Sequence, residues 1–172
     1  MWKDLPLRPA KGGFLRPFGC GEFIREFLMG WGTHGSPTID PNVGAPQSDM
    51  FFHYKQALIQ SHVEDSVAKE AEQRIKKDLP PLTAEETQEA EERYRRRIPY
   101  KTTGCRYHSF VVYFSNLRRL GWVEPSGYQE VSAFQGNYAS GQPRVYYRLA
   151  ARGRAAPAEA WANPMAALYS RR

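Results

Sequence analysis

The side chains best suited to covalent or metal chemistry are scattered along this sequence. The histidines His34, His53, His62 and His108 share no ligand-type spacing with one another or with the two cysteines, so we expect no metal site. Cys105 shortly precedes His108, but no acidic residue nearby could orient the imidazole, and a small buried cysteine is the commoner role. The glycine-rich stretch GWGTHGSP lacks the lysine of a P-loop and the spacing of a dinucleotide-binding loop. The sequence therefore predicts no enzyme, no catalytic residue and no cofactor.

Residues 105–120, CRYHSFVVYFSNLRRL, carry side chains suited to hydrogen bonding instead. Helical spacing places Phe110, Phe114 and Leu117 on one side, as a core face requires. The other side contains no acidic residue and carries His108, Ser109, Val112, Ser115, Asn116 and Arg119. Because acidic side chains are common on ordinary exposed helix faces, their absence favours an anionic partner.

The distribution of charge points in the same direction. Residues 1–60 carry 6 basic and 5 acidic side chains, residues 61–100 carry 8 and 10, and residues 101–172 carry 10 and 3. The net charge of +6 therefore arises in the segment that contains this helix. A basic field concentrated in this way attracts polyanions.

The elements that must position the helix follow it directly. Gly121 is a helix stop, WVEP predicts a short strand, and the three glycines between Ser126 and Gln142 predict a long loop. RVYYRL then alternates as a returning strand. Two earlier helices are expected, one over CGEFIREFLMGWG and one starting at Ser48 or Asp49, with a loop over residues 33–47 between them. A helix followed by a strand hairpin, with helices in front, is the layout of a winged helix-turn-helix.

Residues 101–154 resemble the recognition helix and wing of PadR-like and MarR-like transcriptional regulators. The resemblance rests on an apolar pair, a Gly-Trp-Val step and a match to the closing pattern YxLTxxGR, in which Ala150 replaces the threonine. The matching residues are Phe114, Leu117, Gly121, Trp122, Val123, Tyr147, Leu149, Gly153 and Arg154. The resemblance implies a recognition helix at about 105–120 in the major groove of double-stranded DNA and a wing at about 122–149 on the backbone.

On this interpretation the side chains fall into two sets. We expect contacts to bases from His108, Ser109, Val112 and Asn116, and contacts to phosphates from Lys101, Arg106, Arg119, Arg144 and Arg148. The expected partners are DNA and a second copy of the chain, with no indication of a small-molecule effector. The competing hypothesis is a winged-helix protein-interaction module, or a subunit of a larger assembly, that does not bind DNA directly.

The chain as a whole is predicted to be mainly α with a small β-hairpin, an α+β protein. Residues 1–18 form a basic arm rich in proline and glycine, residues 19–154 the winged-helix domain and residues 155–172 a C-terminal docking tail. The domain includes a charged helical hairpin at 62–99, in which Pro80 and Pro81 end one helix and Thr83 caps the next as part of a capping box with Glu86.

Two questions about this hairpin stay open in the sequence. Either it is an insertion within the helix-turn-helix, or residues 94–98 are the second helix of that motif. It either projects as a dimerisation element or folds back on the core.

Composition limits the location of the protein. Two cysteines cannot form a disulfide scaffold for 172 residues, and no apolar run approaches the roughly 18 residues of a membrane span. The first residues carry charges and prolines where a secretory signal has an apolar core. We therefore expect a cytoplasmic protein with no membrane partner.

Overall fold

A computed structural model describes five stretches of the chain. They are residues 8–10, 14–16, 18–98, 106–130 and 143–169. Within them the protein is mainly helical with a small three-stranded antiparallel sheet, which confirms the α+β class.

The chain divides into two compact units, and the division falls inside one long helix, α2 (Gln47–Lys76). The sheet unit consists of Phe18–Tyr54 and Arg106–Arg172. The hairpin unit consists of Met1–Pro17 and Lys55–Cys105. From Arg106 onward, the predicted DNA-binding helix and the two predicted wing strands belong to the sheet unit.

The three-stranded sheet combines a strand from the N-terminal half of the chain with the two predicted wing strands. β3 (Ala45–Pro46) pairs with β5 (Arg144–Leu149), and β5 pairs with β4 (Val123–Glu130), so the order is β3-β5-β4 and all pairs are antiparallel. Gly44 precedes β3 with a φ of 73°, and a Cβ atom there would lie 1.8 Å from the carbonyl oxygen of Tyr147. Only glycine lets the chain approach β5 this closely.

The prediction of a loop throughout residues 33–47 is wrong at β3, which is a strand. The strand is only two residues long and contains a proline, so neither alternation nor β-propensity marks it. A short 3₁₀ segment, η2 (Thr33–Gly35), also lies in that range. The expected strand hairpin is therefore part of a three-stranded sheet.

Two helices of the sheet unit bury the stripes that their sequence spacing predicts. α1 (Cys20–Leu28) buries Phe23, Ile24, Phe27 and Leu28, and α4 (Tyr107–Arg119) buries Phe110, Phe114 and Leu117. The ring of Phe110 lies 5.4 Å from that of Phe51 and 6.2 Å from that of Phe114. Aromatic contacts therefore join the first turns of α2 to α4.

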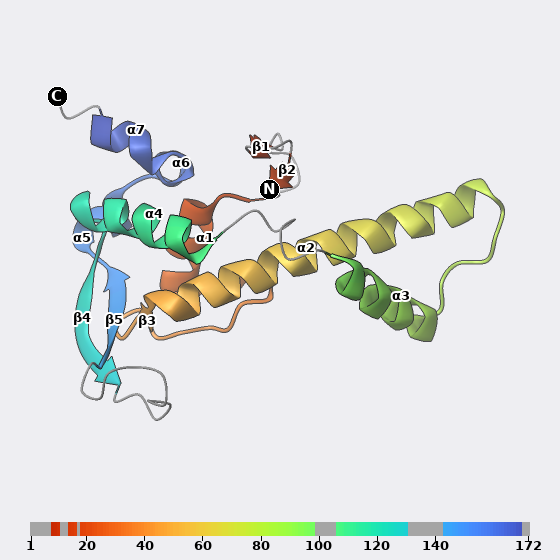
Figure 1. Cartoon of the computed structure of the whole chain (residues 1–172), viewed down its shortest axis with the longest axis horizontal. Helices are drawn as coiled ribbons and strands as arrows, with labels where there is room; N and C mark the ends of the chain where they lie inside the picture. Colours follow the sequence, from red (N-terminus) through yellow and green to blue (C-terminus); the bar gives the residue numbers. More distant parts are fainter. Residues whose placement is uncertain (1–7, 11–13, 17, 99–105, 131–142, 170–172) are drawn as a thin grey trace. The chain divides into compact units, whose positions relative to one another are not determined.

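Three short helices close the sheet unit: α5 (Ala151–Ala155), α6 (Ala158–Ala162) and α7 (Pro164–Tyr169). Trp161 is fully buried, its ring lies 4.8 Å from that of Trp122, and its Nε1 donates to the carbonyl of Gly153 at 3.0 Å. Figure 1 shows α4 at one end of the β4–β5 pair, and α6 and α7 lie on the side of α4 that faces away from the strands. The predicted docking tail therefore packs within its own unit.

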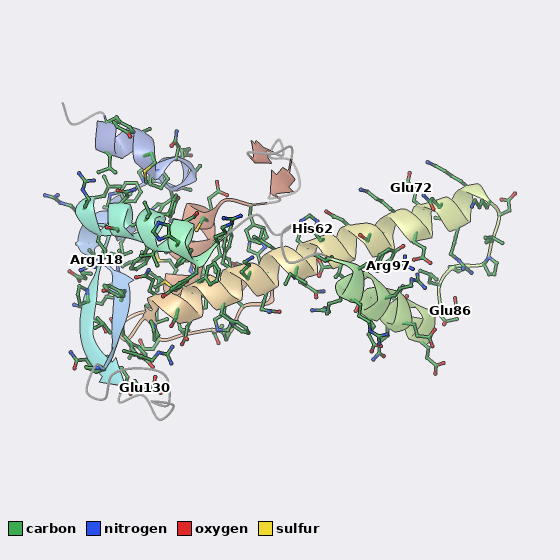
Figure 2. The ribbon with its side chains drawn as sticks, viewed as in Figure 1. His62, Glu72, Glu86, Arg97, Arg118 and Glu130 are labelled. Atoms are coloured by element: carbon green, nitrogen blue, oxygen red, sulfur yellow. The ribbon has the colours of Figure 1, made fainter. Side chains whose placement is uncertain are left out.

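The hairpin unit contains the predicted charged hairpin. α2 ends at Lys76, before the two prolines, and α3 (Ala84–Arg97) begins after Thr83, whose Oγ1 accepts from the backbone N–H of Glu86 at 3.2 Å. The Glu86 carboxylate lies 3.9 Å from Arg74 of α2, a partner that a capping-box interpretation does not foresee. Figure 2 labels Glu86 and Arg97 at the two ends of α3.

Polar contacts hold α3 on α2. The carboxylate of Glu70 accepts from Arg93 and from the hydroxyl of Tyr94, each at 2.8 Å. The hydrogen bond from Tyr94 is the main reason that the pKa of Glu70 lies below its usual value, and Arg93 lowers it further. Apolar side chains are exposed toward the end of α2, where Ile75 is 73% exposed, and Leu79 lies outside the helix.

The arm also differs from expectation. β1 (Arg8–Ala10) pairs with β2 (Phe14–Arg16) in a small antiparallel hairpin that the proline and glycine content does not predict. Phe18, placed in the arm from the sequence, is buried in the sheet unit, where its ring lies 4.0 Å from that of His34.

Candidate functional site

The orientation of α4 follows from its buried stripe. Phe110, Phe114 and Leu117 are at most 1% exposed, so the opposite side of the helix must face outward. The helix ends at Arg119, and Gly121 follows with a φ of 72° and an N–H that donates to the carbonyl of Arg118 at 2.9 Å. Arg106 is the N-cap residue, and its side chain makes no capping hydrogen bond.

An open strip runs along the outward side of α4. It consists of His108, Val112, Ser115 and Arg119, all of which are exposed, and Val112 is 50% exposed. Ser109 is exposed beside the start of the strip. No acidic residue occurs anywhere in α4. The strip offers an imidazole, a hydroxyl, a methyl surface and a guanidinium, which together can contact base edges and phosphates.

Asn116 lies apart from the open strip. It is half-buried, and its side-chain Nδ2 donates to the sulfur of Met165 in α7 at 3.4 Å. A thioether is a weak acceptor, so this contact holds the amide without satisfying it strongly. The sequence predicts a base contact for Asn116 because the spacing within α4 does not reveal α7. The residue of α7 that contacts Asn116 comes 49 positions later in the chain.

The expected phosphate contacts differ from one another in their surroundings. Lys101 lies outside the described residues, while Arg106 and Arg119 are exposed at the two ends of α4. Arg144 pairs with Asp49 and lies 3.8 Å from Glu130. Arg148 Nε donates to Glu124 at 3.1 Å. The two wing-strand arginines are therefore already paired with carboxylates.

A tyrosine pair accompanies the paired arginine near the loop end of the wing strands. The hydroxyl of Tyr146 donates to Glu130 at 2.7 Å, and this hydrogen bond is the main reason that the pKa of Tyr146 rises to about 12. The ring of Tyr128, which is exposed, lies 4.7 Å from that of Tyr146. Glu130 thus receives a hydroxyl and a guanidinium at once, which stabilises this part of the β4–β5 pair.

Two further basic residues, not among the predicted phosphate contacts, lie near the end of α4. The guanidinium carbon of Arg118 lies 5.2 Å from the ring centre of Tyr147. The side chain of Arg152 lies against Gly121, so that a Cβ atom added to Gly121 would be 3.6 Å from Cδ of Arg152. Arg118 falls beside the polar face on a helical projection, and Arg152 lies in the closing motif. On the sequence alone, neither position stands out as a candidate contact.

The histidines and cysteines form no reactive set among the residues that can be placed. No group of three or more histidine, cysteine or acidic side chains there could hold a metal ion. His34 stacks on Phe18, and His53 lies 5.4 Å from the ring of Phe27, where burial lowers the pKa of His53. Cys105 lies outside the described residues. The suggestion of a thiol beside His108 therefore has no structural support.

Comparisons with protein-family models, with curated proteins and with solved structures gave no match. The PadR-like and MarR-like resemblance thus rests on the quoted residues alone. In the parts of the chain that the structure describes, no helix combines the length and apolar character needed to cross a membrane.

Proposed function

We propose that this protein is a winged-helix DNA-binding regulator that reads the major groove with α4. The observation that carries the proposal is the open strip: four exposed side chains on a helix that contains no acidic residue and whose other side is buried in the core. His108, Ser109 and Val112 would face bases, and Ser115 joins them because it shares the strip. Asn116 would join them only if α7 moved.

The order of the elements supports the winged-helix part of the proposal. A winged helix has three helices and three strands, and the strand between its first two helices pairs with the last strand of the wing. Here the order α1, β3, α2, α4, β4 and β5 forms a sheet in the order β3-β5-β4. In this assignment α2 is the second helix and α4 the recognition helix.

The contacts of α2 support its assignment as the second helix. Phe51 in the first turns of α2 contacts the rings of Tyr107 and Phe110 in α4 at 5.2 and 5.4 Å. The charged hairpin is then an insertion between the second and third helices. Residues 94–98, the other option in the sequence, are mostly within α3 of the hairpin unit.

One observation favours the competing function, a protein-interaction module without DNA binding. Ile75 and Leu79 are 73% and 48% exposed near the turn between α2 and α3. Exposed apolar side chains at such a position suit a protein partner, including a second copy of the chain. Homodimer formation and a cytoplasmic location remain predictions within either proposal.

A matched pair of substitutions separates the two functions. Val112→Glu places a carboxylate in the open strip, whereas Phe52→Glu places one at a similarly exposed site, since Phe52 is 56% exposed. Binding to mixed duplex DNA fragments is measured at low salt by fluorescence anisotropy. We expect Val112→Glu to abolish binding and Phe52→Glu to leave it near wild type. If the wild-type protein binds duplexes no more tightly than a neutral control protein does, the regulator proposal fails.

A further inference from the structure

Five of the arginines of the sheet unit fall into two classes by their partners. Arg144 and Arg148, on β5, are paired with carboxylates of Asp49, Glu130 and Glu124. By contrast, no ion pair within the described residues involves Arg118, Arg119 or Arg152. We call these three side chains the arginine corner.

The residues of the arginine corner belong to the end of α4 and to the helix that packs against the turn after it. Arg118 and Arg119 occupy the last turn of that helix, and the side chain of Arg152, from α5, lies against Gly121. The ring of Tyr147 lies beneath the Arg118 guanidinium, and Tyr147 itself packs on Phe114 at 5.0 Å. Arg118 is thereby placed by the core. Figure 2 shows Arg118 and Glu130 at opposite ends of the β4–β5 pair, so the corner is separate from the paired arginine at the loop end.

A simpler role for two of these residues is to complement the helix dipole. Cations in the last turn of a helix contribute about 0.3–1 kcal/mol in this way. The helix end, however, carries only about half a negative charge, whereas the three guanidinium groups carry a full positive charge each. The dipole also gives no reason for Arg152 to lean on Gly121 from another element. An excess of positive charge remains for an external anion.

The position of the corner suits the border of a groove. The open strip runs from His108 to Arg119, which is about 16 Å along the helix axis. The major groove is about 12 Å wide. When the start of α4 faces bases, its last turn therefore lies beside the phosphates that border the groove. The planar guanidinium group matches a phosphate in geometry and can donate two parallel hydrogen bonds to it.

We propose that the arginine corner, rather than the wing strands, is the main phosphodiester-binding site of this protein. The proposal rests on the DNA-binding function and specifies which residues hold the backbone. The wing has little charge to contribute, because Arg144 and Arg148 are paired and the loop sequence VSAFQGNYASGQ contains no charged residue. Arg144 and Arg148 are structural residues that connect β5 to the start of α2 and to β4.

The test compares the salt dependence of DNA binding for two matched pairs of variants of the full chain. Arg118→Gln and Arg152→Gln remove corner charges, and Arg144→Gln and Arg148→Gln remove paired charges. Each lost phosphate contact lowers the slope of log K against log salt by roughly one unit. We expect each corner substitution to lower the slope by that amount and to weaken random and preferred duplexes equally. Arg118→Lys and Arg152→Lys, which keep the charge, should retain most of the slope.

The outcomes distinguish this proposal from the function it rests on. Normal slopes in the corner variants together with reduced slopes in the wing variants would overturn the corner and leave DNA binding intact. Absence of duplex binding by the wild-type protein would overturn both. Polyglutamate serves as a competitor of matched charge: if it displaces the duplex as effectively per charge as a second duplex does, the partner is an acidic protein and the proposal is wrong. Circular dichroism melting of each variant checks that the fold is retained.

Discussion

Truncating Trp161 to alanine tests whether the C-terminal helices are part of the sheet-unit core. The side chain is fully buried, lies 4.8 Å from the ring of Trp122 and donates to the carbonyl of Gly153. Replacing a buried tryptophan by alanine costs about 3–5 kcal/mol, which already includes the cavity. The Gly153 carbonyl also loses its indole donor, a hydrogen bond worth about 1 kcal/mol. We expect the free energy of unfolding to fall by about 4 kcal/mol.

The assay is urea denaturation followed by far-ultraviolet circular dichroism, which does not depend on tryptophan fluorescence. With a denaturant slope of about 2 kcal/mol per molar, the midpoint should fall by about 2 M. Trp31→Ala is the control, because Trp31 is 54% exposed and its contact with Arg25, 5.2 Å from the ring centre, is worth about 0.5–1 kcal/mol. If Trp161→Ala costs no more than Trp31→Ala, α6 is not part of the core and the packing described for the C-terminal segment is wrong.

Three further predictions concern other contacts. Gly153→Ala should destabilise the fold by about 1–3 kcal/mol in thermal melts, because the added Cβ would lie 2.1 Å from the Trp122 carbonyl oxygen; an unchanged melting temperature would show that the turn adapts. The lowered pKa of Glu70 means that its contacts stabilise the hairpin above the usual value of 4.5 and that this stabilisation is lost as the pH falls through the folded value. Glu70→Gln should therefore remove part of the acid sensitivity of unfolding, and a constant difference between the two proteins from pH 7 to pH 3 would contradict this. In selections from a randomised duplex library, Ser115→Ala should reduce discrimination at one base pair, by less than the roughly 1–3 kcal/mol of a bidentate contact because a hydroxyl makes a single hydrogen bond. Asn116→Ala should leave the preference unchanged, and the reverse result would place Asn116 in the groove.

Local patterns in the sequence predicted much of the sheet unit. The spacing of Phe110, Phe114 and Leu117 gave the buried side of α4, and the alternation in RVYYRL gave β5, because period and burial are linked directly. In the hairpin unit, Thr83 predicted the start of α3, because a cap depends on residues only three positions apart. Each of these features is decided within about one helical turn or one strand.

Contacts between distant residues could not be predicted in the same way. β3 forms only because Gly44 allows a close approach to Tyr147, roughly a hundred positions later. The pairing of Arg144 with Asp49 depends on that same approach, so a basic residue expected to meet phosphate proved to have a carboxylate partner. The cover that α7 places over Asn116 is also a tertiary effect. Sequence spacing identifies which face of an element is polar, but it does not identify what the fold brings against that face.

Backbone amide chemical-shift mapping during titration with duplex DNA tests the central claim most directly. If α4 enters the major groove and the arginine corner holds the backbone, the largest shifts should fall on residues 106–119, on the turn at Gly121 and on Arg152. Residues of the hairpin, such as those around Glu70 and Tyr94, should not move. Shifts confined to the hairpin, or no shifts at all at low salt, would contradict the account of α4 as a DNA-reading helix.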